Sequence, residues 1–363
     1  MSEPEVGAAV DSFGVYVHVP FCRHRCDYCA FATWTDKDDL IVDYVDAVVQ
    51  DIRTAVDAGM PRADTVFFGG GTPTRIAGEL LAGIVEAIPT PDDAEVTVEC
   101  NPDDVDDAMM TTYAAAGVNR ISLGVQSMVP RVLDLLGRTH DPSNVHAAVA
   151  AARAAGIMSI NVDLIYGSRT ETIEEWSSTV REAIALGVTH VSAYGLTVEA
   201  GTALAADEER HPDDDDQADK YIVADDLLTA AGFVNYEISN WALDGDECRH
   251  NVLYWSQGDY RGFGCAAHSH ERGRRWWNLR TPERYISAVR SGGSTEAAHE
   301  LLDDETRARE ALELSLRTGR GVPHWALDAA DLEGLVRIEG GRIVLTRQGR
   351  LLANEVSLRL RPR

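Results

Sequence analysis

Apolar residues in the first 200 or so positions occur in two alternating kinds of segment. Short runs rich in β-branched side chains are typical of buried strands, and longer segments with apolar residues three or four apart are typical of amphipathic helices. We predict strands over residues 15–19, 65–68, 96–98, 120–123, 160–164 and 190–194. We predict helices between them over residues 40–56, 79–87, 105–115, 143–155 and 173–186. The pattern therefore indicates six consecutive βα units.

The predicted helices have residues at both ends that suit helix boundaries. Gly59, Gly117, Gly156 and Gly187 lie just beyond the ends of four of them, where the left-handed backbone that ends many helices favours glycine. Acidic clusters, such as residues 103–107 and 213–216, precede apolar periodic segments. Because carboxylates stabilise the positive end of a helix dipole, we expect these clusters to cap helices rather than to bind a metal.

Repeated βα units indicate an α/β protein with a parallel sheet, either a doubly wound stack or a partial barrel. Polar or glycine-rich residues follow every one of the six predicted strands. An open sheet binds its ligands mainly at one switch point, whereas all strand ends of a barrel meet at one mouth. The sequence therefore predicts a partial (β/α)6 TIM-like barrel over residues 1–205.

The pattern changes after residue 205, and we predict a C-terminal α+β extension in two parts. Residues 206–295 contain a helix over 219–230 and an aromatic-rich region over 236–277, and we expect them to form a second layer over the barrel mouth. Residues 296–363 contain a helix over 306–317, strands over 335–338 and 343–345, and a final helix. The order of helix, hairpin and helix suits a small winged-helix-like module.

Charge and composition limit which partners and which cellular location we expect for the protein. The chain has 33 Lys and Arg against 59 Asp and Glu, a net charge of -26, which opposes binding to nucleic acid. We therefore expect no nucleic-acid partner, despite the winged-helix-like module. Apolar stretches are much shorter than the ~20 residues that span a bilayer, and the polar first residues lack the features of a signal peptide. We expect no membrane span and a cytoplasmic location.

Three of the six cysteines lie within eight residues, in the loop after the first predicted strand. Cys22, Cys26 and Cys29 have spacings that let one loop bind three corners of an iron-sulfur cluster. Three ligands leave the fourth iron open, and an open position is typical of a reactive metal. The alternatives are a structural zinc with a fourth ligand such as His24, or a redox pair of Cys26 and Cys29. The redox pair would leave Cys22 unexplained.

With Tyr28 before the third cysteine, the motif resembles that of the radical S-adenosylmethionine (SAM) superfamily. The resemblance implies a 4Fe-4S cluster on Cys22, Cys26 and Cys29, with SAM on the open iron and reductive cleavage of SAM. The glycine-rich segment 69–73 resembles the superfamily motif that meets the methionyl amino group, which implies SAM contacts from Gly70, Gly71 and Thr72. Taken alone, that segment indicates only a tight turn.

Further SAM contacts are implied by similarity to the coproporphyrinogen-dehydrogenase branch of the superfamily. Glu99, Gln126, Arg138 and Asp163 occupy positions that bind SAM in that branch, and Tyr16 matches a position near the cluster. In an unrelated protein, the first four would be solvated or would cap helices, and Tyr16 would belong to the core. Polar groups at a barrel mouth, however, usually orient a ligand.

A second motif resembles the haem-chaperone branch of the same superfamily. His250 and Asn251 precede Tyr254 and Trp255 in the pattern His-Asn-x-x-Tyr-Trp, which is linked to haem binding there. His250 would supply an imidazole to the iron, and Tyr254 or Trp255 would lie against the macrocycle. Cys248 is a weaker candidate ligand. Alternatively, this stretch only packs the second layer, with His250 a core histidine.

The expected function follows from one local difference between two branches. Coproporphyrinogen dehydrogenases carry a further cysteine two residues after the third, where this chain has Phe31. The first hypothesis is a haem chaperone that binds haem and delivers it to acceptor proteins. The second is oxygen-independent coproporphyrinogen III dehydrogenase, and the third is a non-catalytic, cluster-dependent binding module. The expected partners are haem or another porphyrin, haem-accepting proteins and an electron donor, and a homodimer is possible.

Overall fold

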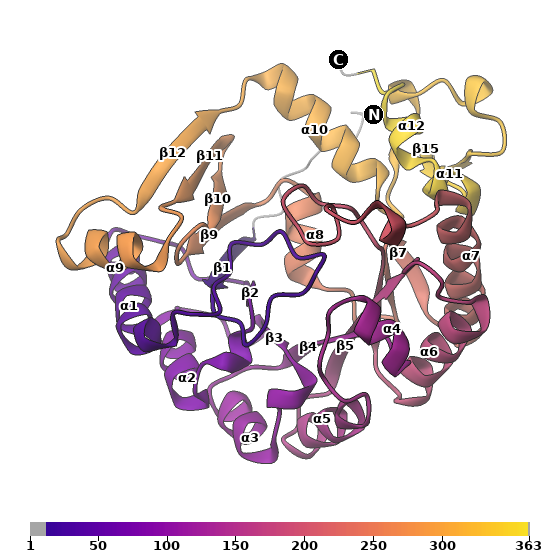
Figure 1. The fold of residues 1–363 in the computed structure, drawn as a ribbon. Helices are drawn as coiled ribbons and strands as arrows, with labels where there is room; N and C mark the ends of the chain where they lie inside the picture. The colour runs from indigo at the N-terminus through magenta and orange to yellow at the C-terminus, as the bar shows by residue number, and fades with distance from the viewer. Residues whose placement is uncertain (1–11, 362–363) are drawn as a thin grey trace.

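A computed structural model describes residues 12–361 and contains one twelve-stranded sheet, whose centre is formed by six parallel strands (Figure 1). These are β1 (Phe13–Val19), β2 (Thr65–Gly70), β3 (Glu95–Cys100), β4 (Arg120–Gln126), β5 (Ser159–Tyr166) and β6 (His190–Gly195). They pair in chain order, as expected for βα units. Beyond them, β1 pairs with β9 and β6 with β8. The predicted partial barrel is confirmed.

Helices between these strands pack on the outer face of the curved sheet (Figure 1). The predicted ones are α1 (Ile41–Asp57), α2 (Gly78–Ala87), α3 (Asp107–Ala115), α5 (Ser143–Ala154) and α6 (Ile173–Ala185). The short α4 (Pro130–Leu135) was not predicted, because six residues give too little periodicity. The four glycines that end helices have φ between 71° and 100°. Asp106 accepts a hydrogen bond from the Met109 amide at the start of α3, which confirms capping there.

The two faces of the central strands differ in polarity. Alternate residues such as Val15, Val17 and Val19 are completely buried against the helices. The residues between them face the barrel interior, and Glu99, Ser122, Asn161 and His190 follow one another in register across β3 to β6. Because side chains alternate along a strand, one apolar face builds the core and the other leaves a polar row inside the barrel.

Residues 206–295 add strands to both edges of the same sheet. Their elements are α7 (Asp214–Ala230), β7 (Val234–Glu237), β8 (Asn240–Ala242), α8 (Arg249–Trp255), β9 (Asp259–Phe263), β10 (His268–Glu271), β11 (Arg274–Asn278) and α9 (Pro282–Arg290). Helix α7 begins within the acidic run, where Asp213 caps it. The α7 residue Gln217 lies beside the mouth and donates to the Leu196 carbonyl.

Helix α8 lies at the opposite end of the barrel from the mouth, although its region was expected to cover the mouth. His250 Nδ1 is 2.9 Å from Oγ1 of Thr65, the first residue of β2. The Arg249 amide donates to Glu95, the first residue of β3. These contacts hold α8 against the amino ends of the parallel strands. The division of the chain into three domains stays a prediction.

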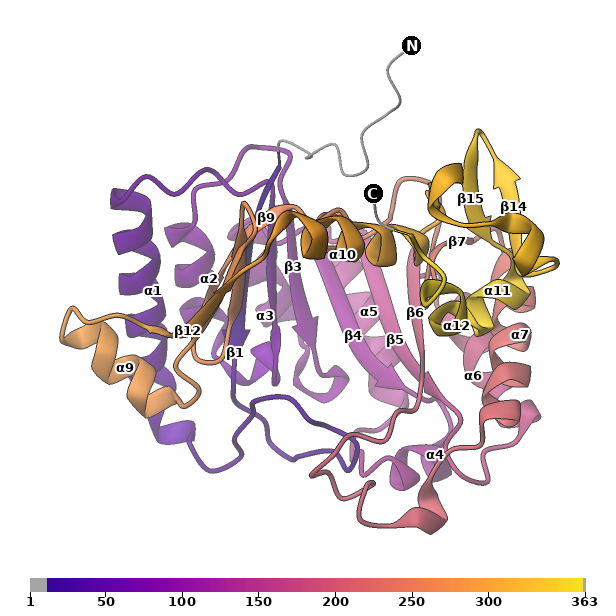
Figure 2. The same cartoon turned by 90° about the horizontal axis from the view of Figure 1, so that it is seen from above.

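The C-terminal part has its own small core. Its elements are β12 (Glu296–Leu301), which ends the large sheet, then α10 (Asp304–Leu316), β13 (Val322–Pro323), β14 (Val336–Glu339), β15 (Arg342–Leu345), α11 (Arg347–Leu351) and α12 (Ala353–Ser357). Leu312, Ile343 and Val356 meet in that core. Figure 2 shows α10 and the strands after it at one end of the barrel, and the loop after β1 at the other. Within residues 12–361, no helix is long and apolar enough to cross a membrane.

Candidate functional site

A cavity of about 610 Å³ opens at the carboxyl ends of the six parallel strands. The loops or ends of all six strands line it, and the lining residues include Cys22, Cys26, Tyr28, Cys29, Gly70, Gly71, Thr72, Glu99, Gln126, Arg138, Asp163 and Tyr194. This set contains the three predicted cluster ligands and all the predicted SAM contacts except Tyr16. The structure thus brings together predicted site residues that are as many as 141 positions apart, from Cys22 to Asp163.

The cysteine loop is fixed by contacts at several points. The Cys22 amide donates to the Trp34 carbonyl at 3.0 Å, and the Trp34 amide donates to the Pro20 carbonyl at 2.8 Å. Asp27, between the second and third cysteines, accepts from Arg210 at 2.7 Å. These bonds hold the loop over the mouth while the three thiols face the cavity. The loop therefore presents to one cavity the three thiols that the cysteine motif requires for a cluster.

Burial and a nearby cation act in opposite directions on the thiols. Burial raises the pKa of the Cys22 and Cys29 thiols, so without a metal both hold their protons at neutral pH. Arg138 Nη1 lies 3.6 Å from Cys26 Sγ, and its Nη2 donates to the Gly124 carbonyl at 2.7 Å. Metal ligation requires the thiolate. The fixed Arg138 cation therefore offsets the negative charge that three thiolates bring into the cavity.

Two glycines at the end of β2 let the chain pack closely beside Cys22. Gly70 has φ of 109°, and a Cβ there would lie 2.3 Å from the His18 ring. A Cβ on Gly71 would lie 3.0 Å from Cys22 Sγ and 2.8 Å from the Val19 carbonyl oxygen. Only glycine fits these positions. The two glycines therefore let this segment pack tightly against β1 and the cysteine loop, which places its backbone beside Cys22.

Two carboxylates line the floor of the cavity. Glu99 accepts a hydrogen bond from the Gly70 amide at 3.2 Å, and burial followed by the nearby Asp163 raises its pKa to about 8. Burial also raises the pKa of Asp163, although Ser122 donates to it at 2.6 Å and Asn161 at 2.9 Å. A cationic ligand with hydrogen-bond donors would stabilise the charged forms of these two buried carboxylates. The amino and ribose hydroxyl groups of SAM have that chemistry.

Sequence reasoning missed Ser122 and Asn161 beside the mouth, whereas Gln126 was a predicted SAM contact and Phe31 was noted for replacing a cysteine. Ser122 and Asn161 orient Asp163, and the available signal was their polar character on the inner face of apolar strands. Gln126 has φ of 62° after an irregularity between β4 and β5. Such a left-handed conformation is uncommon without glycine and often marks a functional site. Phe31 also lines the mouth and is 66% exposed.

The remaining predicted residues lie away from this cavity. Tyr16 lines a smaller cavity of about 170 Å³ inside the barrel, with its hydroxyl 3.1 Å from His18 Nδ1. Cys248 and Tyr254 line the same inner cavity from the other end. His250 is completely buried, and its Nε2 is 2.8 Å from the Tyr254 hydroxyl. The structure therefore separates the haem candidates from the cysteines.

Comparisons with known proteins agree with this arrangement. Residues 16–183 match the family model of the radical SAM superfamily. A relative from Mycobacterium tuberculosis named heme chaperone HemW is 40% identical to this chain, and the match covers 95% of this chain and 93% of the relative. A relative of the same name from Escherichia coli is 35% identical, and the match covers 94% of this chain and 96% of the relative. The solved structure of coproporphyrinogen III oxidase (HemN) from Escherichia coli has a TM-score of 0.83, covers 97% of this chain and 91% of that chain, and is 22% identical. The last comparison shows a shared fold.

The cluster assignment predicts that the cysteines lining the mouth are not equivalent. After anaerobic reconstitution, the protein should hold about four iron and four sulfide ions, and Cys26→Ser should lose most of them. Cys100→Ser is the matched control, because Cys100 is a buried cysteine that lines the same cavity. Iron and sulfide analysis measures the outcome. Equal loss in both variants would contradict the assignment.

The raised pKa of Glu99 predicts a pH-dependent stability. Between the ordinary glutamate pKa of 4.5 and about 8, the folded protein keeps a proton that the unfolded chain releases, so Glu99 lowers stability as pH rises. Without ligands, Glu99→Gln should be more stable than the wild type by on the order of 1–3 kcal/mol at pH 8, and by much less near pH 5. Urea unfolding across this range tests it, with exposed Glu79→Gln as control. A difference independent of pH would refute the prediction.

Proposed function

The chain belongs to the radical SAM superfamily, in the family whose curated members are named heme chaperone HemW, and we propose that it binds haem and delivers it to acceptor proteins. The observation that carries the proposal is the extent of the similarity, 40% identity over 95% of the chain. The His-Asn-x-x-Tyr-Trp motif on α8 supports it from within the sequence. In this proposal, the barrel carries a SAM site at its mouth and a haem site elsewhere.

At the mouth, we propose that Cys22, Cys26 and Cys29 hold a 4Fe-4S cluster and leave one iron open for SAM. When bound, such a cluster would supply the electron for reductive cleavage of SAM. Arg138 offsets the charge of the thiolates, while the Gly71 backbone and the carboxylates of Glu99 and Asp163 orient the ligand. Gln126, Tyr28, Gly70 and Thr72 complete the walls. Tyr16 lies inside the barrel, and we propose that it acts on the site indirectly, through its contact with the His18 ring.

At the other end of the barrel, we propose that haem binds beside α8. Trp255 is half-buried and lines a cavity there, so its ring is available to a macrocycle. Burial lowers the pKa of His250 to about 3, which keeps the imidazole neutral, as iron ligation requires. Both ring nitrogens of His250 already have partners, Thr65 and Tyr254. His250 can therefore ligate iron only after one of these contacts breaks.

The other expectations about partners and location remain proposals. Haem-accepting proteins, an electron donor and a homodimer fit the proposed function, as does a cytoplasmic location. Oxygen-independent coproporphyrinogen III dehydrogenase remains the second candidate, because the chain shares the fold of HemN. The exposed Phe31 at the mouth, in place of a cysteine, favours the chaperone.

The haem proposal predicts saturable binding that depends on Trp255. Titration followed by absorbance should reach saturation near one haem per chain. Trp255→Leu removes an aromatic contact worth about 0.5–1.5 kcal/mol, so the dissociation constant should rise roughly 2- to 10-fold. Trp277→Leu, on β11 and away from this cavity, is the control and should bind like the wild type. No haem uptake by the wild-type protein would reject the proposal.

A second prediction separates the candidate functions. Reduced, reconstituted protein with SAM should release 5'-deoxyadenosine and leave coproporphyrinogen III unchanged. Release of 5'-deoxyadenosine would exclude a non-catalytic module. Conversion of coproporphyrinogen III to protoporphyrinogen IX, measured by chromatography after oxidation, would instead establish the dehydrogenase.

A further inference from the structure

The cavity beside α8 is larger than the mouth cavity and lies at the amino end of the barrel. Its volume is about 980 Å³, against about 610 Å³ at the mouth. Its walls come from the start of β2, from α8 and α10, from the loop 318–320 and from β15. We call it the amino-end groove. Its lining includes Tyr236, Trp255, Ser315, Arg320 and Arg342.

Two arginines of the C-terminal part line the groove without a carboxylate partner. Arg342 donates to the carbonyls of Arg320 and Gly321, both at 2.7 Å, and to Ser315 Oγ at 3.4 Å. The Arg320 side chain is exposed. Within residues 12–361, neither guanidinium forms an ion pair. Burial and the Arg320 cation together lower the pKa of Arg342. Two close, uncompensated cations therefore border the groove.

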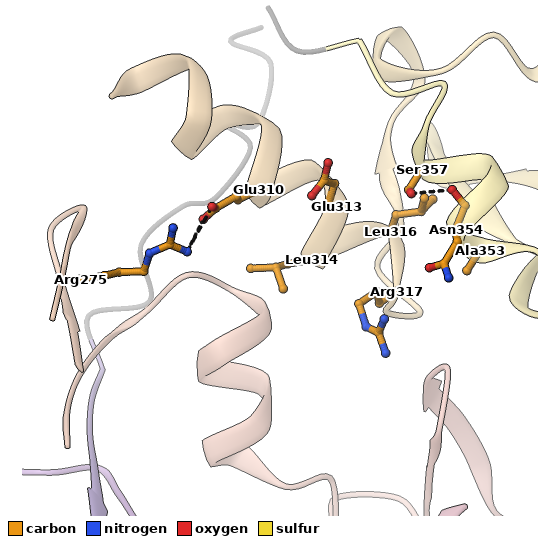
Figure 3. A pocket seen from close by; sticks show the side chains of 9 residues that line it. All are labelled: Arg275, Glu310, Glu313, Leu314, Leu316, Arg317, Ala353, Asn354 and Ser357. Atoms are coloured by element: carbon orange, nitrogen blue, oxygen red, sulfur yellow. Dashed lines mark hydrogen bonds and ion pairs between the residues drawn. The ribbon is translucent and has the colours of Figure 1, made fainter. Parts of the chain in front are cut away.

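A neighbouring pocket, formed by α10, α12 and Arg275 of β11, shows the contrasting case (Figure 3). Arg275 there donates to Glu310 at 3.1 Å, as the dashed line in Figure 3 marks. Arg317, which also lines that pocket, donates to the buried Glu237 at 2.8 Å. Those cations are neutralised by the protein itself. The arginines of the amino-end groove, in contrast, still have charge to offer a ligand.

The rest of the groove suits a flat, largely apolar molecule. The rings of Tyr236 and Trp255 lie 5.8 Å apart between centroids, and Val252 and Leu253 extend the apolar surface. Asp64 and Glu247 also line the groove, and Asp64 already accepts a hydrogen bond from the Phe13 amide at 2.9 Å.

A ligand that satisfies both parts of the groove has an aromatic face and at least one carboxylate. Haem has both features, and guanidinium groups bind carboxylates through charge and hydrogen bonds. Because Nε and Nη2 of Arg342 already donate to protein oxygens, Arg342 would use Nη1, whereas Arg320 presents an exposed guanidinium. We propose that Arg320 and Arg342 bind the propionate carboxylates of haem while the macrocycle lies against Trp255. This inference rests on the proposed haem function and extends it by assigning the recognition of the cargo to the C-terminal part of the chain.

The proposed haem site lies far from the proposed SAM site. The groove and the SAM mouth lie at opposite ends of the parallel strands, because Thr65 begins β2 in the groove and Gly70 ends it at the mouth. Haem at the groove is therefore separated from the cluster by the length of the barrel. The inner cavity, lined by both Glu99 and Tyr254, lies between the two.

Comparing haem with its dimethyl ester, which has the same ring but no carboxylates, tests the inference. Wild-type protein should bind haem at least 10-fold more tightly than the ester. Arg320→Glu adds a carboxylate beside Arg342 and should weaken haem binding by a similar factor, with little effect on the ester. Arg337→Glu is the matched control, because Arg337 lies on β14 of the same small sheet, outside the groove. It should bind haem as the wild type does.

The outcomes distinguish this inference from the proposed function. If the wild-type protein binds haem and its ester equally, and Arg320→Glu changes neither, the carboxylate assignment is overturned while the chaperone proposal stands. If the wild-type protein takes up no haem, both fail. Thermal unfolding of Arg320→Glu verifies that the variant is folded, and the ester comparison in the wild type requires no variant at all.

Discussion

The polar inner face of the parallel sheet is the constraint on which the rest of the structure depends. One face of each central strand is apolar and packs on the helices, which makes the fold stable, but the other face carries carboxylates, amides and a histidine. Buried polar groups need partners. Asp163 finds Ser122 and Asn161, and the His190 ring lies 2.6 Å from the Asn161 amide oxygen. Glu99, at the top of this row, has one partner and faces the mouth. Asp163, Asn161 and His190 thus have partners inside the barrel, whereas Glu99 faces a cavity that can hold a ligand.

The two ends of the barrel are closed by different parts of the chain. The cysteine loop covers the mouth and is fixed by Trp34 and Arg210. Helix α8 closes the amino end, where Thr65 and Glu95 hold it. His250 has a structural part in this closure whatever else it does, because its ring nitrogens join α8 to β2 and to Tyr254. The separate closures give each proposed ligand its own entrance.

Much of the barrel and its mouth followed from local sequence signals. Each predicted strand was found, because β-branched runs next to helical periodicity leave few alternatives, and the cysteine spacing identified the cluster loop. The position of α8 could not be predicted, since it depends on a contact between Thr65 and His250, 185 residues apart. The parallel pairing of β9 with β1 is equally non-local. The groove arginines escaped notice because Arg320 and Arg342 have no motif, and only the fold shows that neither meets a carboxylate.

The central claim is that SAM and haem bind at opposite ends of one barrel. Hydrogen-deuterium exchange of the reconstituted protein, measured with each ligand separately, tests it most directly. SAM should slow exchange in the cysteine loop and in the segment after β2, residues 20–37 and 69–74. Haem should slow exchange in α8 and in the loop 318–321 without affecting the cysteine loop. Protection of the cysteine loop by haem, with none in α8 or in residues 318–321, would contradict the account.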